Sequence, residues 1–323
     1  MHKRLICGII ATITLITCLF LGSCSNSGKT ENLVDVSIPG VYFFDVGMGE
    51  CIFINFGDGT NVMIDTGDVS KKTKTIIDAL KKSNVSKINH LILTHPDADH
   101  VGGTVDFVDN FEIENAYIPH VRDLSLFPSF DKAKTSLEVK CVNTTTSKTG
   151  LSIKGEKYFL AFLSPESPFN HKSPYVDLNA SEFPSSNQIK NVSPIIYVSL
   201  FGKRFLFTGD ALSSQETAVM ENYVNGYYDL IFGKDEVNLK SIDVLKVANH
   251  GGNTSSSEYF LSVVSPKCAV LCVGRNGNSY PSGDALKRIM NNSPNVNLLR
   301  TDVKGGVCML FDGDFNMKTS TFK

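Results

Sequence analysis

The sequence lacks a surplus of positive charge. It contains 31 Lys and Arg side chains against 33 Asp and Glu side chains, which gives a formal net charge of −2. The first 24 residues hold two of the basic side chains, Lys3 and Arg4, so the remainder has 29 against 33 and a net charge of −4. We therefore expect no general electrostatic field for binding long polyanions.

The sequence is also short of membrane spans and of paired cysteines. Beyond the N-terminal segment no long apolar run occurs, so the body of the chain offers no channel-forming segment. Cys268 and Cys272 flank the strand-like run CAVLC, but no second pair completes a four-sulfur zinc site. We expect these two cysteines and also Cys51, Cys141 and Cys308 to be buried thiols. An exported location permits a disulfide, but the spacing selects no pair.

The first 24 residues have the pattern of a secretory signal peptide. Lys3 and Arg4 precede an apolar run from Leu5 to Leu21, and small residues lead into Cys24. The stretch LGSC resembles the lipobox of bacterial lipoproteins, in which the cysteine becomes the lipidated N-terminus. An uncleaved transmembrane anchor is the alternative, because the run is long for a signal core. We expect an exported protein that Cys24 anchors as a lipoprotein to the outer face of the bacterial cell membrane.

The rest of the chain is predicted to be a tether followed by one domain. Residues 25–40 are polar and end in Pro-Gly, which is typical of a flexible tether. Residues 41–323 begin with short apolar runs between turns, then a helical pattern with lysines on one face, and hairpins and helices alternate again in the second half. This alternation predicts an α/β (α+β) fold with two sheets packed face to face and helices outside.

Two further features concern helix starts and an insertion. Ser-x-x-Glu patterns at Ser213–Glu216 and Ser255–Glu258 predict capping boxes. The segment from His120 to Asn191 is less regular, and we expect either a lid or substrate loop, or plain surface decoration.

Side chains that bind metals are concentrated in LTHPDADHVGG. His95, Asp97, Asp99 and His100 follow an apolar run within six residues. Four ligands on so short a segment suit two adjacent ions better than one tetrahedral ion. In an extended loop the first three project to one side and His100 follows at the turn. A solvated acidic loop is the alternative, but it explains neither the histidines nor Gly102-Gly103, which would let the backbone approach a ligand closely.

Two distant segments end in the same way. The strand-like run before FTGD ends at Asp210, where one carboxylate can bridge two cations, and VANHGG places His250 before two glycines. A lone histidine after a strand is usually a packing residue. Three strand ends that each carry a metal-ligand residue beside glycine form a more specific pattern, which predicts a site for two divalent ions, zinc or manganese.

The motifs MIDTG, THPDADH, FTGD and NHGG resemble the metallo-β-lactamase superfamily. That resemblance implies a four-layer αββα sandwich with a one- or two-metal site between its sheets. Within the superfamily, FFDVGMGE, LTHPDADHVGG, NVSPIIYVSLFGKRFLFTGDA, LKVANHGG and RTDVKGG are similar to the soluble hydrolase domain of ComEC-type competence proteins. The similarity covers residues 41–323.

The resemblance also implies a ligand set. One ion is assigned to His95 and Asp97, the other to Asp99, His100 and His250, with Asp210 bridging them and Asp65 supporting the ligands from behind. Aspartate at position 97, where the superfamily has histidine, makes the site richer in oxygen and more suitable for manganese.

Some positions depart from the family pattern. No histidine precedes FTGD; Asn191 and Ser193 stand in that region as supporting residues, so the first ion is expected to be weakly held. His120 and His171 are candidates to replace the missing ligand. The family motif HHG is NHG here, with Asn249 in place of the first histidine, and the family motif DVGQGD is DVGMGE. Contacts with the substrate are therefore expected to differ from those of the family.

The predicted activity is hydrolysis by a metal-bound hydroxide that Asp99 and Asp210 orient. Phosphodiesters are the favoured substrates, and the enzyme would then act as a nuclease if the phosphodiester is DNA. The lack of positive charge favours a smaller phosphodiester or a cell-wall ester. β-Lactams are disfavoured, because lactamases have arginine at the position of His100 and a cysteine ligand absent here. Backbone N–H groups of Val101–Gly103 are expected to receive an anion such as phosphate.

Two other classes of protein remain as alternatives. One is a non-catalytic binding lipoprotein that keeps the fold, and the other is a DNA-uptake accessory that needs a membrane partner for transport. The sequence indicates no obligate protein partner.

Overall fold

The computed structural model describes residues 33–121, 124–166, 189–275 and 280–323. Within the chain, Leu33–Lys323 forms one compact unit. The predicted signal segment with Cys24, and also His171, lie outside the described residues. Among the described residues no helix is long and apolar enough to cross a membrane.

The first sheet has eight strands in the order β15-β14-β1-β2-β3-β4-β5-β6. Their bounds are β1 Gly40–Phe43, β2 Ile52–Asn55, β3 Asn61–Ile64, β4 Lys87–Ile92, β5 Glu112–Ile118, β6 Asn143–Thr146, β14 Gly306–Phe311 and β15 Met317–Phe322. Strands β1 to β3 are antiparallel and β3 to β6 are parallel. Because β14 pairs with β1, the last hairpin of the chain completes the sheet that the first strand begins.

The second sheet has seven strands in the order β13-β12-β11-β10-β9-β8-β7. Their bounds are β7 Ser152–Lys154, β8 Tyr158–Phe162, β9 Ile196–Leu200, β10 Lys203–Phe207, β11 Val244–Lys246, β12 Cys268–Leu271 and β13 Asn297–Arg300. Strands β7 to β10 are antiparallel, and β10 to β13 are parallel. Each sheet therefore has a parallel half, in which all strands end at the same edge.

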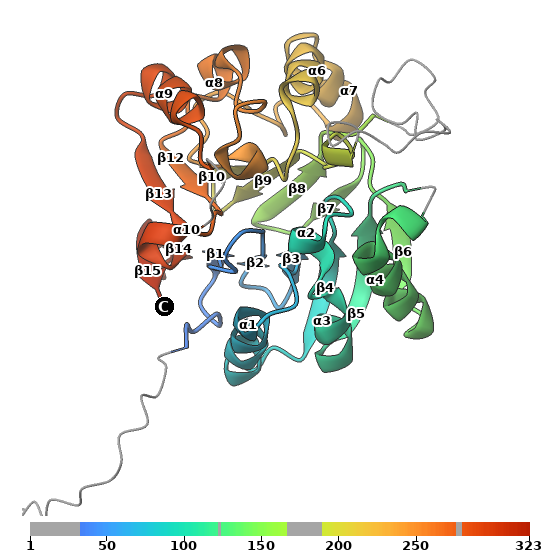
Figure 1. Cartoon of the computed structure of the whole chain (residues 1–323). Coiled ribbons are helices and arrows are strands. Elements are labelled where there is room, and N and C mark those ends of the chain that lie inside the picture. The colour runs from blue at the N-terminus through green and yellow to red at the C-terminus, as the bar shows by residue number, and fades with distance from the viewer. Residues whose placement is uncertain (1–32, 122–123, 167–188, 276–279) are drawn as a thin grey trace, which may run out of the picture. The chain divides into compact units, whose positions relative to one another are not determined.

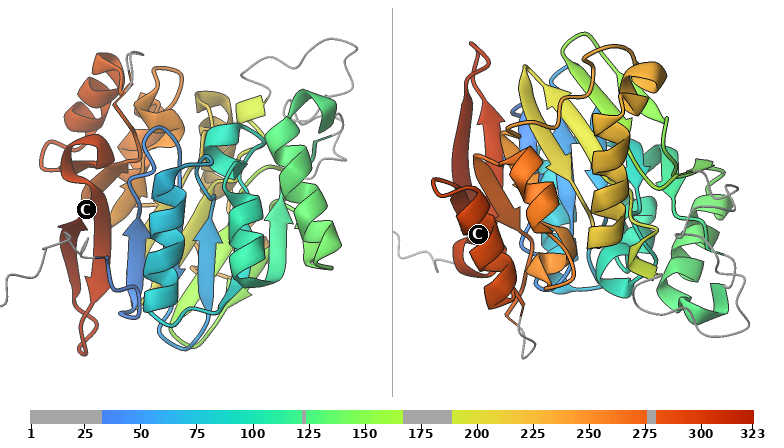
Figure 2. Two further views of the ribbon diagram at one scale, coloured as in Figure 1. Left: turned by 60° about the horizontal axis from the view of Figure 1, so that its bottom comes forward. Right: turned by 90° about the horizontal axis from the view of Figure 1, so that it is seen from above.

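Helices cover the outer faces of both sheets (Figure 1, Figure 2). Their bounds are α1 Lys71–Lys82, α2 Ala98–Val101, α3 Thr104–Asn110, α4 Pro128–Val139, α6 Ser213–Val224, α7 Tyr227–Phe232, α8 Glu258–Val264, α9 Gly283–Asn292 and α10 Thr301–Lys304, with 3₁₀ turns η1 Leu124–Leu126 and η2 Ala248–Gly251. Helices α1, α3 and α4 lie on the first sheet, and α6, α8 and α9 on the second (Figure 1). The predicted four-layer αββα sandwich is confirmed.

Three apolar clusters separate the four layers. Successive side chains of a strand point to opposite faces, and β1 shows the consequence. Val41 and Phe43 belong to the cluster between the sheets, whereas Tyr42 belongs to the cluster under the first helix layer. The third cluster lies under the second helix layer and includes Leu206 of β10. Strands buried on both faces explain why the sequence has continuous apolar runs rather than strict alternation.

The chain already contacts the domain before β1. Val36 is fully buried, and Asn55 Nδ2 donates hydrogen bonds of 3.0 Å to the carbonyls of Val36 and Ser37. The packed domain therefore includes residues on the N-terminal side of β1.

Both predicted capping boxes are wrong in detail. Helix α6 has Leu212 as its N-cap without a side-chain cap, and α8 is capped by Ser257, whose Oγ accepts from the N–H of Phe260. Glu216 does not fold back on its own helix. Its carboxylate accepts from the N–H groups of Ser256 and Ser257, at 2.6 and 2.9 Å, so it ties α6 to the start of α8.

The expectation of an irregular segment over 120–191 is wrong for its described part. Helix α4 and strands β6, β7 and β8 lie there. Strand β6 has the polar sequence NTTT at the edge of the first sheet, which explains why no apolar pattern marked it. The lid prediction concerned the whole segment 120–191, and its part at residues 167–188 lies outside the described residues.

Most of the described cysteines are buried thiols, as predicted. Cys51, Cys268, Cys272 and Cys308 are buried and unpaired, whereas Cys141 is an exposed free thiol.

Candidate metal centre

Side chains from three loops meet at one edge of the sandwich. His95 follows the end of β4, Asp210 follows β10, and His250 follows β11. The carboxyl ends of parallel strands share an edge, so these loops are brought together by the parallel half of each sheet. The Nε2 atom of His95 lies 3.8 Å from Asp210 Oδ2. The Nε2 atoms of His100 and His250 each lie 3.5 Å from Asp210 Oδ1.

The two remaining predicted ligands lie beside these imidazoles. Asp97 Oδ2 is 3.4 Å from His95 Nε2, and Asp99 Oδ2 is 3.4 Å from His250 Nε2. The structure thus brings all six predicted ligands together. The two oxygens of Asp210 face opposite sides: Oδ2 faces the His95 side, and Oδ1 faces the side of His100 and His250.

The segment that carries four of these ligands is not the extended loop expected from the sequence. Asp97 has extended backbone angles, but Ala98–Val101 forms the short helix α2. Successive residues on a helix point about 100° apart, so Asp99 and His100 reach the centre from different directions. The helix, rather than strand-like alternation, spreads the ligands.

Gly102 and Gly103 are needed for packing against protein rather than against a ligand. A Cβ on Gly102 would lie 2.6 Å from the carbonyl oxygen of Ala98, and one on Gly103 would lie 2.5 Å from that of Thr66. The predicted anion site on the N–H groups of Val101 to Gly103 is also wrong. These groups donate to the carbonyls of Asp97, Ala98 and Gly67, so none of them is available.

Asp65 supports the centre from behind. Its carboxylate accepts from the N–H and the hydroxyl of Thr94 at 2.8 and 2.6 Å, and Oδ2 lies 2.6 Å from His100 Nδ1. On the other side of the centre, His250 Nδ1 donates to the carbonyl oxygen of Cys272 at 2.7 Å. Both imidazoles are therefore fixed through Nδ1 and direct Nε2 into the centre, where the two Nε2 atoms are 3.3 Å apart.

The backbone at the centre is strained. Asp65, Asn249 and His250 have φ angles of 56°, 50° and 52°, in the left-handed region that non-glycine residues seldom adopt. Strain of about 1–3 kcal/mol per residue persists where the surroundings hold a functional geometry.

The ligand atoms fit a divalent cation. Three sets of three residues have ligand atoms within 4.8 Å of one another. Two consist of predicted ligands, namely His95, His100 and Asp210, and Asp99, His100 and His250; the third joins Glu50 and Asp65 to His100. Two buried atoms in the centre, His95 Nε2 and Asp210 Oδ1, have no hydrogen-bond partner. Buried polar atoms are nearly always satisfied, so buried ligand atoms without a partner in a cluster of imidazoles and carboxylates indicate a bound cation. Imidazole and carboxylate ligands suit zinc and manganese.

The electrostatics of the centre also favour a cation. Burial alone would lower the pKa of His100, but Asp65, Asp210 and Asp99 outweigh it and raise this pKa to about 10. Burial likewise opposes ionisation of Asp210, yet the surrounding histidines and Lys190 hold its pKa well below the usual value. The surplus of carboxylates thus retains a proton on a buried imidazole unless another cation shares the site.

The residues before the FTGD strand differ in position from the prediction. Ser193 supports the centre, since its Oγ accepts from the N–H of Asp210 at 3.3 Å. Asn191 turns away and its Nδ2 lies 3.3 Å from Ser214 Oγ. Its neighbour Lys190, which sequence reasoning missed, reaches the centre with Nζ 2.8 Å from Asp210 Oδ2. His120 belongs to none of the ligand sets found among the described residues.

A buried ion pair lies directly behind the centre, and it too was missed. Glu50 and Lys246 are fully buried and paired with each other. Lys246 Nζ also donates to the carbonyl of Gly209 at 2.8 Å, and the N–H of Glu50 donates to the carbonyl of Asp99 at 3.2 Å. The pair therefore links the residue before Asp210 to the ligand loop of the first sheet.

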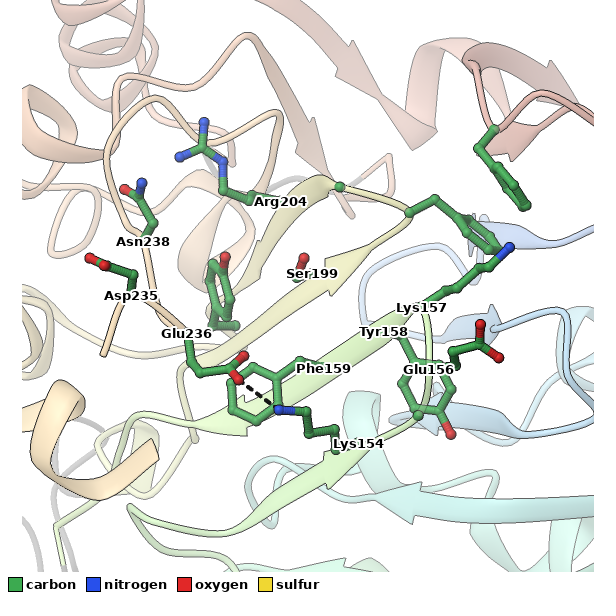
Figure 3. Close-up of a pocket in the computed structure, with 15 residues that line it drawn as sticks. Lys154, Glu156, Lys157, Tyr158, Phe159, Ser199, Arg204, Asp235, Glu236 and Asn238 are labelled. Atoms are coloured by element: carbon green, nitrogen blue, oxygen red, sulfur yellow. Dashed lines mark hydrogen bonds and ion pairs between the residues drawn. The ribbon is translucent and has the colours of Figure 1, made fainter. Parts of the chain in front are cut away.

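A cavity of about 820 Å³ lies at the opposite end of strands β8, β9 and β10. Figure 3 shows the Lys154–Glu236 ion pair, 2.6 Å long, on one side of it and Lys157 on the other. Lys157 Nζ stacks over the ring of Phe315 at 4.2 Å. Basic and acidic side chains are mixed in its wall, so it has no single chemical preference.

The fold and the centre together define a class of protein. Residues 44–177 match the family model described as the metallo-beta-lactamase superfamily. Residues 44–177 are thus similar to the metallo-beta-lactamase superfamily, and the resemblance inferred from the motifs is confirmed.

Among characterised proteins, competence proteins are similar to this chain. It is 26% identical over 319 residues to ComE operon protein 3 of Bacillus subtilis (strain 168). The aligned region covers 93% of this chain and 35% of that protein. It is 25% identical over 268 residues to Competence protein ComA of Neisseria gonorrhoeae, which covers 83% of this chain and 31% of that protein. The chain therefore spans about a third of the length of these relatives.

A solved structure with a similar fold is CmlA, a diiron beta-hydroxylase from Streptomyces venezuelae. The TM-score is 0.48 with 10% sequence identity, over 88% of this chain and 54% of that one.

Proposed function

We propose that the chain is a metal-dependent hydrolase that acts on phosphodiesters at this centre. The observation that carries the proposal is the meeting of six ligand side chains from three distant loops, with His95 Nε2 and Asp210 Oδ1 buried and unpartnered. A purely structural cluster would leave the cost of those two atoms unexplained.

The residues of the centre have different roles in the proposed hydrolysis. When bound, a divalent ion of zinc or manganese polarises the scissile bond and lowers the pKa of water at the site. His95, His100 and His250 would present their Nε2 atoms to the cation, and Asp99 and Asp210 would orient the attacking water. Attack by a cysteine thiolate is disfavoured. Cys51 follows Glu50 and Cys272 follows β12, and burial raises the pKa of both thiols, so neither ionises readily.

Phosphodiesters are the proposed substrates for two reasons. Oxygen-rich metal sites suit the transfer and hydrolysis of phosphoryl groups, and a relative bears the name competence protein, which favours DNA among phosphodiesters. The formal net charge of −2 limits affinity for long polymers. Short oligonucleotides or small phosphodiesters are therefore the form of substrate we propose.

We also propose that the protein is exported and anchored as a lipoprotein through Cys24. The signal-like segment and the LGSC stretch support this. Labelling cells with a radioactive or alkyne fatty acid tests it. The chain should carry the label, and Cys24→Ala should not.

The activity is tested on residues 25–323, with bound metals measured first. Hydrolysis of bis-p-nitrophenyl phosphate, single-stranded DNA and a β-lactam is then compared with and without added manganese or zinc. We expect metal-dependent cleavage of the first two and none of the lactam. Bound metal without cleavage of any ester would instead indicate a binding protein that keeps the fold.

A further inference from the structure

Two departures from the family pattern meet at one side chain, Lys190. The chain has no histidine before the FTGD strand, and it has Asn249 where the family has the first histidine of HHG. Lys190 Nζ donates to Asp210 Oδ2 at 2.8 Å and also to the Oδ1 atom of Asn249. The lysine side chain is only 16% exposed, so the ammonium is held inside the centre.

Asn249 is oriented to receive this lysine. Its Nδ2 lies 3.3 Å from Thr254 Oγ1, which directs Oδ1 toward Lys190. Its backbone N–H donates to the carbonyl of Gly209 at 3.0 Å, which fixes its position next to Asp210. An amide oxygen only accepts hydrogen bonds and is therefore a suitable partner for an ammonium group. Asn249 and Lys190 thus form a matched pair.

The pair makes the two sides of Asp210 unequal. On the Oδ1 side, Asp99, His100 and His250 form one ligand set. Asp210 Oδ1 lies 3.5 Å from Nε2 of both histidines, so it can join that set. On the Oδ2 side only His95 and Asp97 are added, and the ammonium of Lys190 already bonds to the oxygen that a second ion would need. A divalent ion there would face a positive charge across one shared oxygen, which weakens its binding.

We propose that Lys190 takes the place of a second metal ion. The chain holds one divalent cation tightly on the Oδ1 side of Asp210, and the Lys190 ammonium is the fixed second positive charge. The ammonium donates a hydrogen bond to a non-bridging oxygen of a phosphodiester substrate, as lysine does in many phosphate sites. This inference rests on the proposed function for the class of substrate, but its stoichiometry does not depend on turnover.

The first test measures metal stoichiometry on the full chain. Protein stripped with a chelator is titrated with manganese by calorimetry, and its metal content after dialysis is measured by mass spectrometry. We expect one tightly bound ion per chain in the native protein and two in Lys190→Met, which removes the charge and keeps the length. Lys190→Arg keeps the charge and should keep one ion. Lys74→Met, on the exposed face of α1, is the matched control and should also bind one ion.

Either of two results overturns the inference: two tight ions of similar affinity in the native protein, or a single ion in Lys190→Met. Circular dichroism establishes that the variants are folded. Failure of the proposed function would look different, since it would leave these stoichiometries in place while no phosphodiester is cleaved.

The second test measures binding of inorganic phosphate to protein loaded with one equivalent of manganese per chain, so that the weaker second site of Lys190→Met stays empty. Loss of a hydrogen bond from a charged donor should weaken phosphate binding in Lys190→Met about 10- to 100-fold. Lys190→Arg should restore most of the affinity, whereas a purely structural lysine would leave phosphate affinity unchanged in both variants. Equal affinity in Lys190→Met and the native protein contradicts the inference.

Discussion

The two sheets supply the centre in different ways. The first sheet contributes four ligands from one continuous segment, His95 to His100, with Asp65 behind them. The second sheet contributes Asp210 and His250 from the ends of two neighbouring strands, 40 positions apart in the chain. The ligands from the first sheet are thus neighbours in the sequence, whereas those from the second sheet come together only when β10 and β11 pair.

The two sheets also differ in charge at the centre. Loops of the first sheet bring the carboxylates Glu50, Asp65, Asp97 and Asp99. The second sheet brings Asp210 together with two lysines: Lys190 pairs with Asp210 on the same sheet, and Lys246 pairs with Glu50 of the first sheet. Opposite charges therefore face each other across the junction between the sheets at Glu50 and Lys246. This pair contributes both to the contact between the two sheets and to the position of the centre in front of it.

The largest effect is expected at Asp210, the residue of the second sheet whose carboxylate faces all three histidines of the centre. Asp210→Asn removes the carboxylate that faces His95 with one oxygen and His100 and His250 with the other. It should lower phosphodiester hydrolysis by about 10³-fold, because several kcal/mol of transition-state stabilisation are lost. Hydrolysis of bis-p-nitrophenyl phosphate is the measurement, with circular dichroism to establish folding. A folded variant with full activity would show that Asp210 does not bridge.

The ion pair that joins the two sheets should determine stability. Lys246→Met leaves Glu50 buried without its partner and should lower the free energy of unfolding by about 3–5 kcal/mol. The double variant Glu50→Leu, Lys246→Met should lose much less, because neither charge is left unpaired. Urea unfolding gives both values. Equal losses in the single and double variants would mean that the lysine contributes through packing alone.

A smaller effect is expected behind the ligand segment of the first sheet. Asp65→Asn alters the acceptor that fixes His100 Nδ1 and should weaken metal binding about 10- to 100-fold. Calorimetric titration with manganese measures this. Metal affinity equal to that of the native protein would mean that Thr94 and the packing alone orient the imidazole.

The smallest effect is expected at the start of β11, away from the centre. Burial alone would raise the pKa of Asp243, but hydrogen bonds from Lys267 and from the N–H of Arg204 outweigh it and lower this pKa. The carboxylate therefore stabilises the fold above the unfolded pKa of about 3.9, and this contribution disappears as the pH falls through the lower folded value.

Asp243→Asn should thus lower the free energy of unfolding by about 1–2 kcal/mol at pH 7, and the difference should shrink below pH 4. Urea unfolding at both pH values measures it, and metal binding should be unchanged. A difference that grows toward low pH would contradict the stated direction of the pKa shift.

The sequence could predict those parts of the centre that follow from local order. The sandwich followed from the alternation of hairpins and helices, and the candidate ligands followed from residue types at strand ends. Lys190, by contrast, belongs to a segment without periodicity, and Asn249 was visible only as a departure from a motif. Glu50 and Lys246 are 196 positions apart, so only the packing of the two sheets makes them a pair.

The helix starts illustrate the same limit. Glu216 matched a capping box by spacing, yet its carboxylate binds the backbone of Ser256 and Ser257 because α6 and α8 lie side by side. A motif read along the chain cannot reveal a partner 40 residues away.

The most direct test of the centre is anomalous diffraction from crystals grown with manganese. We predict an anomalous peak bound by the side chains of Asp99, His100, Asp210 and His250. An anomalous peak only at another site on the protein, or no peak in contact with Asp210, would contradict the assignment of these loops as a metal centre.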